Sequence, residues 1–462
     1  MPDFSGPLGL KALRQGYAKG DFTPVEIAKI ALDRAEGPLA ELNGLSSLDR
    51  DMTMAEAEAS THRWREGKTL SALDGAFISF KDSFHIKGLP RWHGTACHLG
   101  TLSSYDALPV KHARAAGMIV TCKTTMPDFA MLMSGLSSQH GVIGNAWNRD
   151  DSPGGSSSGA PSSVVLGAAT VALGTDMVGS VRLPAALSGL ASIKPTQGRI
   201  AYDPAGSFRS AGPMAASVAE VSLTLEALGR FSDGDHFSAE GAFEPKPDSG
   251  IKGKKIALWR NANWGDAVDA DTRSALAKAA DLLADQGANI VEVSPPLTPA
   301  DYMAIHWNML LIGASDYFTL PEDRRKRIHP AIGEMYHSLI DKGAIFAAEM
   351  QHNLLVATAR FTKALDAFDF VLSPALPQRR FSAELPCPTP ELGAASHQTF
   401  ACWFNQAGWP AATLPILDLK DGGVPISIQI AGKRFCDADV LNLAKRLEEA
   451  RGFDVTFPKV EK

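Results

Sequence analysis

The residues best suited to chemistry are serines that stand among glycines, together with one lysine at the end of an apolar segment. The run GGSSSG at residues 154–159 places three hydroxyl groups where glycines let the backbone approach a ligand closely. A second run, GTDMVGSVRLP at residues 174–184, carries Ser180 in a turn before a helix, where free backbone N–H groups can bind an oxyanion. Each run alone is more often a structural loop than a site, so their combination carries the prediction.

Lys81 is the base that such a serine needs. It follows the apolar residues 75–80, so we expect it at the inner end of a buried strand. A serine hydroxyl is a weak nucleophile until an adjacent base takes its proton. A lysine can do so only when neutral, which requires burial to lower its pKa from about 10.4 to about 7–8. Asp82 follows directly, but strand alternation points its carboxylate to the other side.

These three features, in this order, resemble the amidase signature family. In that family a strand ends in Lys-Asp or Lys-Glu, a GGSSGG run follows, and a GTDxGGS[IV]RxP run comes last. Here Ser156 lies 75 positions after Lys81, and Ser180 lies 24 positions after Ser156, as expected of the family. The runs KPT at residues 194–196 and NQAGWP at residues 405–410 also match. The resemblance covers most of the chain and is weakest from about residue 233 to 372.

The resemblance implies an α/β fold, the amidase signature fold, with one large mixed, mostly parallel β-sheet covered by helices on both faces. It also implies that Ser180 is the nucleophile, that Ser156, held by a cis peptide bond, relays the proton, and that Lys81 is the base. The implied oxyanion hole consists of the backbone N–H groups of Met177, Val178, Gly179 and Ser180. The implied supporting residues are Ser157, Asp176 and Arg182.

The same resemblance indicates where a substrate binds. The acyl group is expected to contact Ala130, Met131 and Ser134, in the segment after Met126. Helical residues further along, whose aromatic and methionine content suits an apolar leaving group, are Tyr302, His306, Trp307 and Met309. A buried core would have the same composition, so whether residues 301–313 line the pocket stays open.

The chain departs from the family pattern at two positions. Ser158 stands where the family usually has Gly, and Val178 stands at the first Gly of the GGS run. Val178 adds a side chain beside the implied oxyanion hole and can reshape the acyl pocket. Neither change removes a residue of the Lys-Ser-Ser triad, so the departures concern substrate preference more than activity.

The implied activity is hydrolysis of C–N bonds in small-molecule amides through an acyl-enzyme on Ser180, with aryl carbamates (urethanes) or esters as further substrates. No metal and no organic cofactor is required. The alternative is a glutaminase-type subunit of a tRNA amidotransferase, which acts with partner chains. In that subfamily Gln follows the Arg of the nucleophile turn, whereas here Leu183 follows Arg182.

A different serine hydrolase is also conceivable, because residues 155–159 fit the GxSxG nucleophile elbow. That elbow requires a strand immediately before it, and the polar residues 148–153 do not predict one. It also requires a downstream Asp and His, but the last histidine, His397, stands in no comparable motif. The elbow is therefore disfavoured.

Alternating strand and helix patterns position these residues. Apolar or β-branched runs predict strands at residues 75–80, 118–122, 255–259 and 424–430. Helical patterns begin after the capping-box residue Thr23 and recur at residues 110–116, 160–172, most of 271–368, and 437–449. We expect a single domain over residues 1–462, with its core at about 60–230 and 370–462 and a more variable helical substrate-pocket region at about 255–370.

The composition argues against several partner classes. A net charge of −6 does not suit nucleic acid binding, which needs a basic face. The longest uncharged stretch, residues 152–175, is too rich in Ser, Gly and Pro in its first half to span a membrane. Five widely spaced cysteines indicate neither a disulfide framework nor a zinc site, and residues 1–20 lack the apolar core of a signal peptide. We expect a cytoplasmic protein that acts on a small amide or carbamate without nucleic acid or membrane; homodimer formation stays open.

Overall fold

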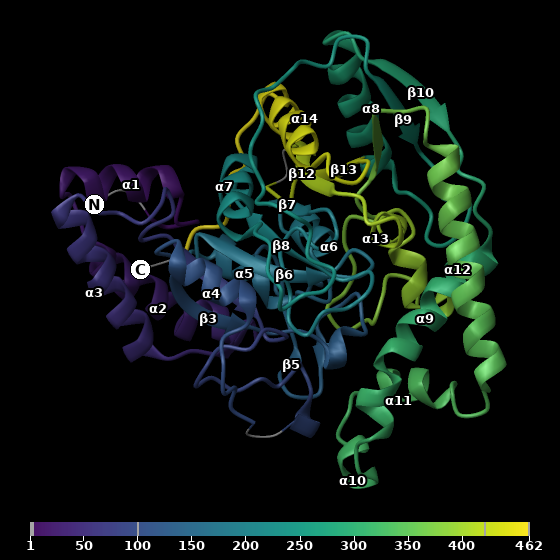
Figure 1. Cartoon of the computed structure of the whole chain (residues 1–462), viewed down its shortest axis with the longest axis horizontal. Coiled ribbons are helices and arrows are strands. Elements are labelled where there is room, and N and C mark those ends of the chain that lie inside the picture. Colours follow the sequence, from purple (N-terminus) through teal and green to yellow (C-terminus); the bar gives the residue numbers. More distant parts are fainter. Residues whose placement is uncertain (1–3, 99–100, 420–421, 461–462) are drawn as a thin grey trace.

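A large mixed β-sheet crosses the centre of the molecule and is flanked by helices (Figure 1). The computed structural model describes residues 4–98, 101–419 and 422–460. The strand order of the sheet is β1-β3-β2-β6-β8-β7-β12-β13-β11-β9-β10. Its strands are β1 (Leu45–Ser47), β2 (Phe77–Lys81), β3 (Ile119–Thr124), β6 (Val171–Asp176), β7 (Ala191–Lys194), β8 (Ser210–Ala215), β9 (Lys255–Trp259), β10 (Asn289–Val293), β11 (Phe370–Pro374), β12 (Ala411–Leu417) and β13 (Ile426–Gly432).

The helices are distributed along the whole chain, and a small separate hairpin pairs β4 (Leu136–Ser137) with β5 (Gly141–Val142). The α-helices are α1 (Leu10–Lys19), α2 (Pro24–Arg34), α3 (Arg50–Glu66), α4 (Leu108–Ala115), α5 (Gly159–Val165), α6 (Arg182–Ala186), α7 (Val218–Leu228), α8 (Ala270–Asp285), α9 (Pro299–Phe318), α10 (Glu322–Arg325), α11 (Pro330–His337), α12 (Ala344–Ala364), α13 (Cys402–Gln406) and α14 (Asp437–Ala450). Short 3₁₀ turns lie at Ala96–His98, Asp128–Ala130, Pro390–Leu392 and Ala394–His397, and a π-helical turn lies at Ala35–Leu39.

Both faces of the sheet are buried, which β9 illustrates. Its alternate residues Ile256 and Leu258 join the core formed with α4, α7, α8 and α14, whereas Ala257 and Trp259 join the core formed with α6, α9, α12 and α13. A strand that is buried on both faces reads as a continuous apolar run, and this is the pattern that residues 255–259 have. The expected α/β architecture, a large mixed sheet with helices on both faces, is confirmed.

The two strands that bear on chemistry are neighbours. β2 and β6 are parallel, with Phe80 paired to Leu173, so their carboxyl ends meet at the same edge of the sheet. β2 ends there with Lys81, and β6 ends there with Asp176, after which a short turn leads into α6. Segments almost a hundred residues apart are thereby brought together, as in other sheets whose ligands bind at the carboxyl ends of strands.

Most of the expected elements are present, with two differences. The helix expected at residues 160–172 stops at Val165, and Gly167, with φ of +71°, turns the chain so that β6 can begin at Val171. Small apolar residues fit a buried strand and a buried helix equally, so the pattern could not divide the two. The region 271–368, expected to be helical throughout most of its length, also contains β10.

Other local expectations are confirmed. Thr23 caps α2, and its hydroxyl and the Glu26 carboxylate form the reciprocal hydrogen bonds of a capping box. Residues 233–254 contain neither helix nor strand and connect α7 to β9. Among the described residues, no helix is long and apolar enough to cross a membrane.

Candidate active site

Lys81 is completely buried and is surrounded by hydroxyl groups. Its Nζ donates to Ser156 Oγ over 2.8 Å and to Thr175 Oγ1 over 3.0 Å. Burial, together with the smaller effect of the nearby Arg209 guanidinium, lowers the pKa of Lys81 to about 7 against the opposing effect of Asp176. The amine is therefore able to exist in its neutral, basic form near pH 7.

Asp82 does not neutralise this amine. Its carboxylate accepts from Lys123 Nζ over 2.8 Å and from the backbone N–H groups of Trp92 and Gly94. The strand alternation expected from the sequence thus directs Asp82 away from Lys81. A carboxylate beside Lys81 would favour the charged amine, which cannot accept a proton. Because Asp82 is directed elsewhere, it does little to keep the amine in that charged form.

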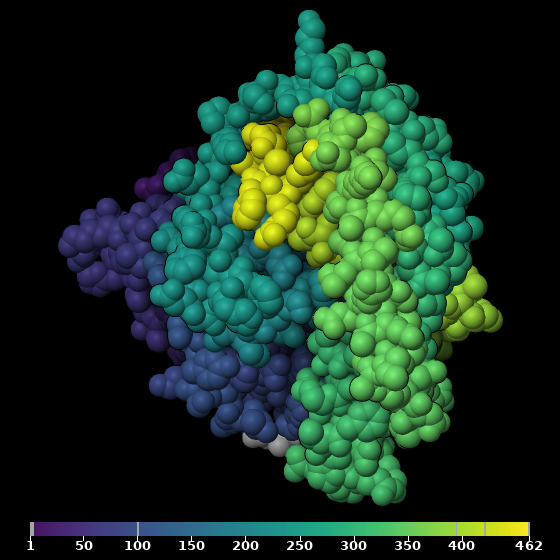
Figure 2. Space-filling view, turned by 45° about the vertical axis from the view of Figure 1, so that its right-hand side comes forward, coloured from purple at the N-terminus to yellow at the C-terminus, as the bar shows by residue number. Residues whose placement is uncertain are grey.

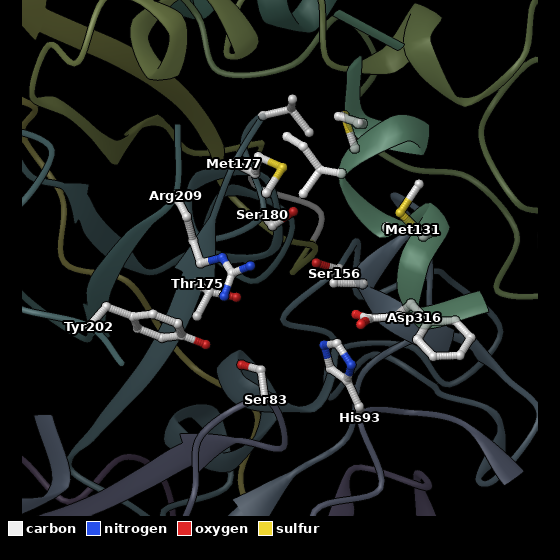
Figure 3. Close-up of a pocket in the computed structure, with 16 residues that line it drawn as sticks. Ser83, His93, Met131, Ser156, Thr175, Met177, Ser180, Tyr202, Arg209 and Asp316 are labelled. Atoms are coloured by element: carbon white, nitrogen blue, oxygen red, sulfur yellow. The ribbon is translucent and has the colours of Figure 1, made fainter. Parts of the chain in front are cut away.

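Ser156 and Ser180 line the same hollow, and Figure 3 shows their side chains close to one another at its wall. The Gly155–Ser156 peptide bond is cis, as the family resemblance implies. Ser157 braces the two loops against each other, because its N–H donates to the Ser180 carbonyl over 3.3 Å and its hydroxyl donates to the Thr175 carbonyl over 3.4 Å. The hydroxyl groups of both loops are thereby held at the end of β2.

The turn between Asp176 and Arg182 presents backbone N–H groups to this hollow. The N–H of Gly179 donates to Asp176 Oδ1 over 2.7 Å, so it is already engaged. Among the described residues, the N–H groups of Met177, Val178 and Ser180 have no acceptor within hydrogen-bonding distance. Of the four N–H groups expected to form an oxyanion hole, three therefore have no hydrogen-bond acceptor among the described residues, and that of Gly179 is engaged by Asp176.

Only glycine fits at position 179. Its φ is +126°, and a Cβ there would lie 2.3 Å from Leu183 Cδ1 and 2.9 Å from Ala401 Cβ. Val178, by contrast, is accommodated with its side chain buried at the wall of the hollow. The departure of this chain from the family pattern at residue 178 therefore fills space at the wall of the hollow that a glycine would leave open.

Arg182 and Asp176 form the buried support beneath the turn. The guanidinium binds both carboxylate oxygens, with Nε to Oδ2 and NH2 to Oδ1 each at 2.9 Å. Its remaining donors reach the Ala401 carbonyl, Asn405 Oδ1 and Gln429 Oε1. Burial alone would raise the pKa of Asp176, but the Arg182 guanidinium outweighs it and holds the pKa well below its usual range. The carboxylate thus stays ionised and keeps its bond to the turn.

The hollow has a volume of about 700 Å³ including the open space at its mouth. One wall is a single face of α9, because Met309, Ile312, Gly313 and Asp316 recur at helical spacing. The opposite wall carries Arg209, whose guanidinium lies over the Tyr202 ring at 5.0 Å from its centroid. Figure 3 shows charged, polar and apolar side chains around one space.

The three residues expected to bind the acyl group divide into two groups. Ala130 and Met131 line the hollow. Ser134 does not: it is completely buried behind the serine loop, where its carbonyl accepts from the Ser158 hydroxyl over 3.2 Å. Ser158, the other departure from the family pattern, therefore acts in packing the loop and is not part of the hollow's lining.

Of the four helical residues considered for the leaving-group side, only Met309 lines the hollow. Tyr302, near the start of α9, is buried; its ring stacks on that of Trp264 and lies edge-on to that of Trp403. Trp307 packs edge-on against Phe346 of α12, and His306 is not among the lining residues. Trp307 lies almost half a turn from Met309 around α9, so it points to the opposite face. Tyr302 shares the face of Met309 but lies about two turns nearer the start of α9, outside the hollow.

Sequence reasoning missed several residues of the hollow. Thr175 stands within the run at residues 174–184, but its contact with Lys81 depends on the β2–β6 register, which the sequence does not show. Arg209, Tyr202, His93 and Asp316 come from separate segments, and no spacing in the sequence connects them. Among the described residues, no group of His, Cys, Asp and Glu side chains is arranged to hold a metal ion.

The chain is similar to known proteins along nearly its whole length. A sequence model of the family described as Amidase matches residues 26–441. The A subunit of glutamyl-tRNA(Gln) amidotransferase from Neisseria meningitidis serogroup C is 32% identical, over 92% of this chain and 94% of that protein. The corresponding protein of Bdellovibrio bacteriovorus is 30% identical, over 92% of this chain and 93% of that protein.

Solved structures share the fold at lower identity. A bacterial aryl acylamidase of the amidase signature enzymes superposes with a TM-score of 0.88 at 22% identity, covering 96% of both chains. The 6-aminohexanoate cyclic dimer hydrolase gives a TM-score of 0.86 at 22% identity, covering 98% of both chains. The A subunit of the glutamyl-tRNA(Gln) amidotransferase from Thermotoga maritima gives 0.78 at 20% identity, covering 100% of this chain and 99% of that one.

Proposed function

The chain belongs to the amidase signature family, a family of hydrolases that act on carbon–nitrogen bonds, and from this we propose that it cleaves a small amide through an acyl-enzyme on Ser180. The observation that carries the proposal is the contact of 2.8 Å between Lys81 Nζ and Ser156 Oγ in a fully buried setting. A lysine whose pKa is lowered to about 7 by burial supplies a base near neutral pH. No carboxylate is needed to activate the serine.

In the proposed reaction, neutral Lys81 accepts the proton of Ser156 while Ser156 accepts the proton of Ser180. Ser180 Oγ then attacks the amide carbonyl carbon, and the negative charge that develops on the carbonyl oxygen is stabilised by backbone N–H groups of the turn. The donors available for this are those of Met177, Val178 and Ser180. The same relay, run in reverse, protonates the leaving nitrogen as the C–N bond breaks.

Hydrolysis of the acyl-enzyme completes the cycle. A water molecule gives its proton to the same relay, attacks the ester carbonyl, and releases a carboxylic acid and free Ser180. An aryl carbamate or an ester could follow an identical path up to the acyl-enzyme, so they remain candidate substrates. Because amides, carbamates and esters share these reaction steps, any selectivity among them must come from the residues that line the hollow.

The proposed chemistry could serve either a stand-alone amidase or a glutaminase-type subunit of an amidotransferase, and the relatives favour the subunit. The sequence first indicated a stand-alone amidase of small molecules. The identity of 32% with the A subunit of an amidotransferase favours instead a glutaminase-type subunit that supplies ammonia to partner chains. The departure at Leu183 does not touch the hollow, since that side chain is buried beneath Gly179.

The test is an assay of the purified chain alone on an anilide, a primary amide, glutamine, an aryl carbamate and an ester, with Ser180→Ala as the matched inactive variant. We expect turnover by the native chain, loss of turnover in Ser180→Ala, and an acyl adduct on Ser180 detected by mass spectrometry. Full activity in Ser180→Ala would exclude the proposed nucleophile. Glutamine hydrolysis that requires added partner chains would establish the subunit setting, whereas turnover of simple amides by the chain alone would establish the other.

A further inference from the structure

Two side chains of opposite charge face the hollow without a partner of their own. Arg209 and Asp316 lie on opposite sides of the space in front of Ser156 (Figure 3). Among the described residues, neither side chain makes a hydrogen bond, and neither forms an ion pair within 4.0 Å. Each is therefore available to a charged group of a substrate.

Arg209 is held in place from one side only. Its guanidinium lies over the Tyr202 ring, and Tyr202 is itself buried and packs edge-on against Phe84 at 5.2 Å. The guanidinium is thereby positioned while its N–H donors stay unsatisfied, and their planar arrangement matches a carboxylate.

Asp316 is placed by the face of α9 that lines the hollow, one turn beyond Ile312 and Gly313. The nearest labelled ring in Figure 3 is that of His93, which does not supply a counter-charge. His93 is partly buried, and its desolvation holds its pKa well below its usual range, so the ring is neutral near pH 7. Asp316 is thus an exposed residue at the wall of the hollow that makes no ion pair among the described residues, and its carboxylate can accept from an ammonium group.

We propose that Arg209 and Asp316 are specificity-determining residues, which bind a carboxylate and an ammonium group of the substrate and so select zwitterionic amides of the amino-acid type. This inference rests on the proposed hydrolysis at Ser180, and it names the substrate class of that same site. Two charged contacts on opposite walls fix both the position and the direction of a short chain, so that its amide carbonyl is presented to Ser180.

The experiment uses four amides that differ only in charge: butyramide, γ-aminobutyramide, glutaramate and glutamine. The native chain is assayed on all four, beside Arg209→Met and Asp316→Asn. Arg65→Met and Asp285→Asn are the matched controls, because both residues are exposed and neither lines the hollow. Since Arg209 also lowers the pKa of Lys81, activities are compared as ratios between substrates, in which an effect common to all four cancels.

We expect kcat/KM for glutamine to exceed that for butyramide by about a hundredfold or more in the native chain, since each charged contact contributes about tenfold. Arg209→Met should reduce the glutaramate-to-butyramide ratio by about tenfold and leave the γ-aminobutyramide-to-butyramide ratio as it was. Asp316→Asn should reduce the γ-aminobutyramide-to-butyramide ratio by about tenfold and leave the glutaramate-to-butyramide ratio as it was. The control variants should retain both ratios.

Equal turnover of butyramide and glutamine by the native chain, or ratios that neither pocket variant alters, would overturn the inference while leaving the proposed function intact. Turnover of an anilide but of none of the four amides would also overturn it alone. If the native chain hydrolyses nothing, the proposed function fails, and binding then decides the inference. Calorimetry of Ser180→Ala with glutamine should show binding that is weakened about tenfold when Arg209→Met is added, and absence of that weakening would overturn it.

Discussion

The segment that contains Ser156 and Ser180 is packed differently from the helical segment formed by α9 and α12. Every residue from 152 to 196 is buried except Met177, which is partly exposed. In α12, only Leu354, Ala357 and Phe361 are buried, and Figure 2 shows the helix as an exposed ridge in light green. The first segment is fixed by contacts on all sides, whereas the second needs only one apolar face.

This difference explains why one segment could be recognised and the other could not. A residue that is packed on all sides tolerates few substitutions, so long runs such as residues 174–184 keep a recognisable order. A helix that contacts the protein along one stripe can change most of its residues without loss of stability. We infer that the buried segment determines which bond is broken, and that the face of α9 determines which molecule is accepted.

The largest effect is expected from the loss of the base. Lys81→Met should reduce kcat/KM by about a hundredfold to ten-thousandfold, because the Ser156–Ser180 relay loses its proton acceptor. In the native chain kcat/KM should rise with pH through about 7, since Lys81 is active only after it loses its proton and burial lowers its pKa to about 7. The measurement is kcat/KM across pH 5–9. A rise of the same size in Lys81→Met would assign the titration to another group.

A loss of stability is expected when the support of the buried segment is removed. In the native chain, Arg182 Nε and NH2 each donate to the Asp176 carboxylate over 2.9 Å. Asp176→Asn removes this negative charge and leaves the buried Arg182 guanidinium without a counter-charge. We expect the free energy of unfolding to fall by about 3–5 kcal/mol. Denaturation in urea measures it, and Asp285→Asn, on the exposed face of α8, is the control. An unchanged midpoint would mean that the pair does not support the turn.

A smaller effect is expected at the boundary between the two segments. Val178→Gly restores the usual family residue and removes a side chain from the wall of the hollow. The ratio of kcat/KM for hexanamide to that for butyramide should rise by about tenfold, the size expected for one or two methylene groups in a pocket. Ser158→Gly restores the other departure, behind the lining, and should leave this ratio as it is. A fall in the ratio for Val178→Gly would show that the valine does not limit the acyl group.

The smallest effect is expected on the exposed face of α12. Ile345 is 77% exposed, so Ile345→Ser should change the free energy of unfolding by no more than about 0.5 kcal/mol and leave kcat/KM unchanged. Urea denaturation and the standard assay together measure both quantities. A large loss of stability or activity would mean that this face is covered in solution, and the contrast between the two segments would then be false.

The sequence predicted the residues of the triad because they stand in ordered runs, and it predicted burial of Lys81 because an apolar strand precedes it. It missed Thr175, whose contact with Lys81 depends on the register between β2 and β6. It could not find Arg209 or Asp316, since each is a single charged residue on a separate element. It placed Ser134 in the pocket from the resemblance alone, while the backbone folds that residue behind the serine loop.

The same reasoning accounts for the elements of the fold. Strands buried on both faces, such as β9, were predicted because every residue in them is apolar or stands at an end. β10 was missed because three of its five residues, Asn289, Val291 and Glu292, are exposed and its pattern has no apolar run. The periodicity of apolar residues in a sequence indicates which faces of an element are buried. An edge strand that is mostly exposed has no such periodicity, so it is not predicted.

The bonds of Arg182 also have a consequence for the order in which the molecule is made. Its guanidinium is completed by Ala401, Asn405 and Gln429, which are synthesised more than two hundred residues after it. While the chain emerges from the ribosome, the nucleophile loop exists long before its last supports do. A nascent or truncated chain that lacks β13 therefore contains Lys81, Ser156 and Ser180 but lacks one of the acceptors that hold Arg182, and the support of the turn is complete only when synthesis is nearly finished.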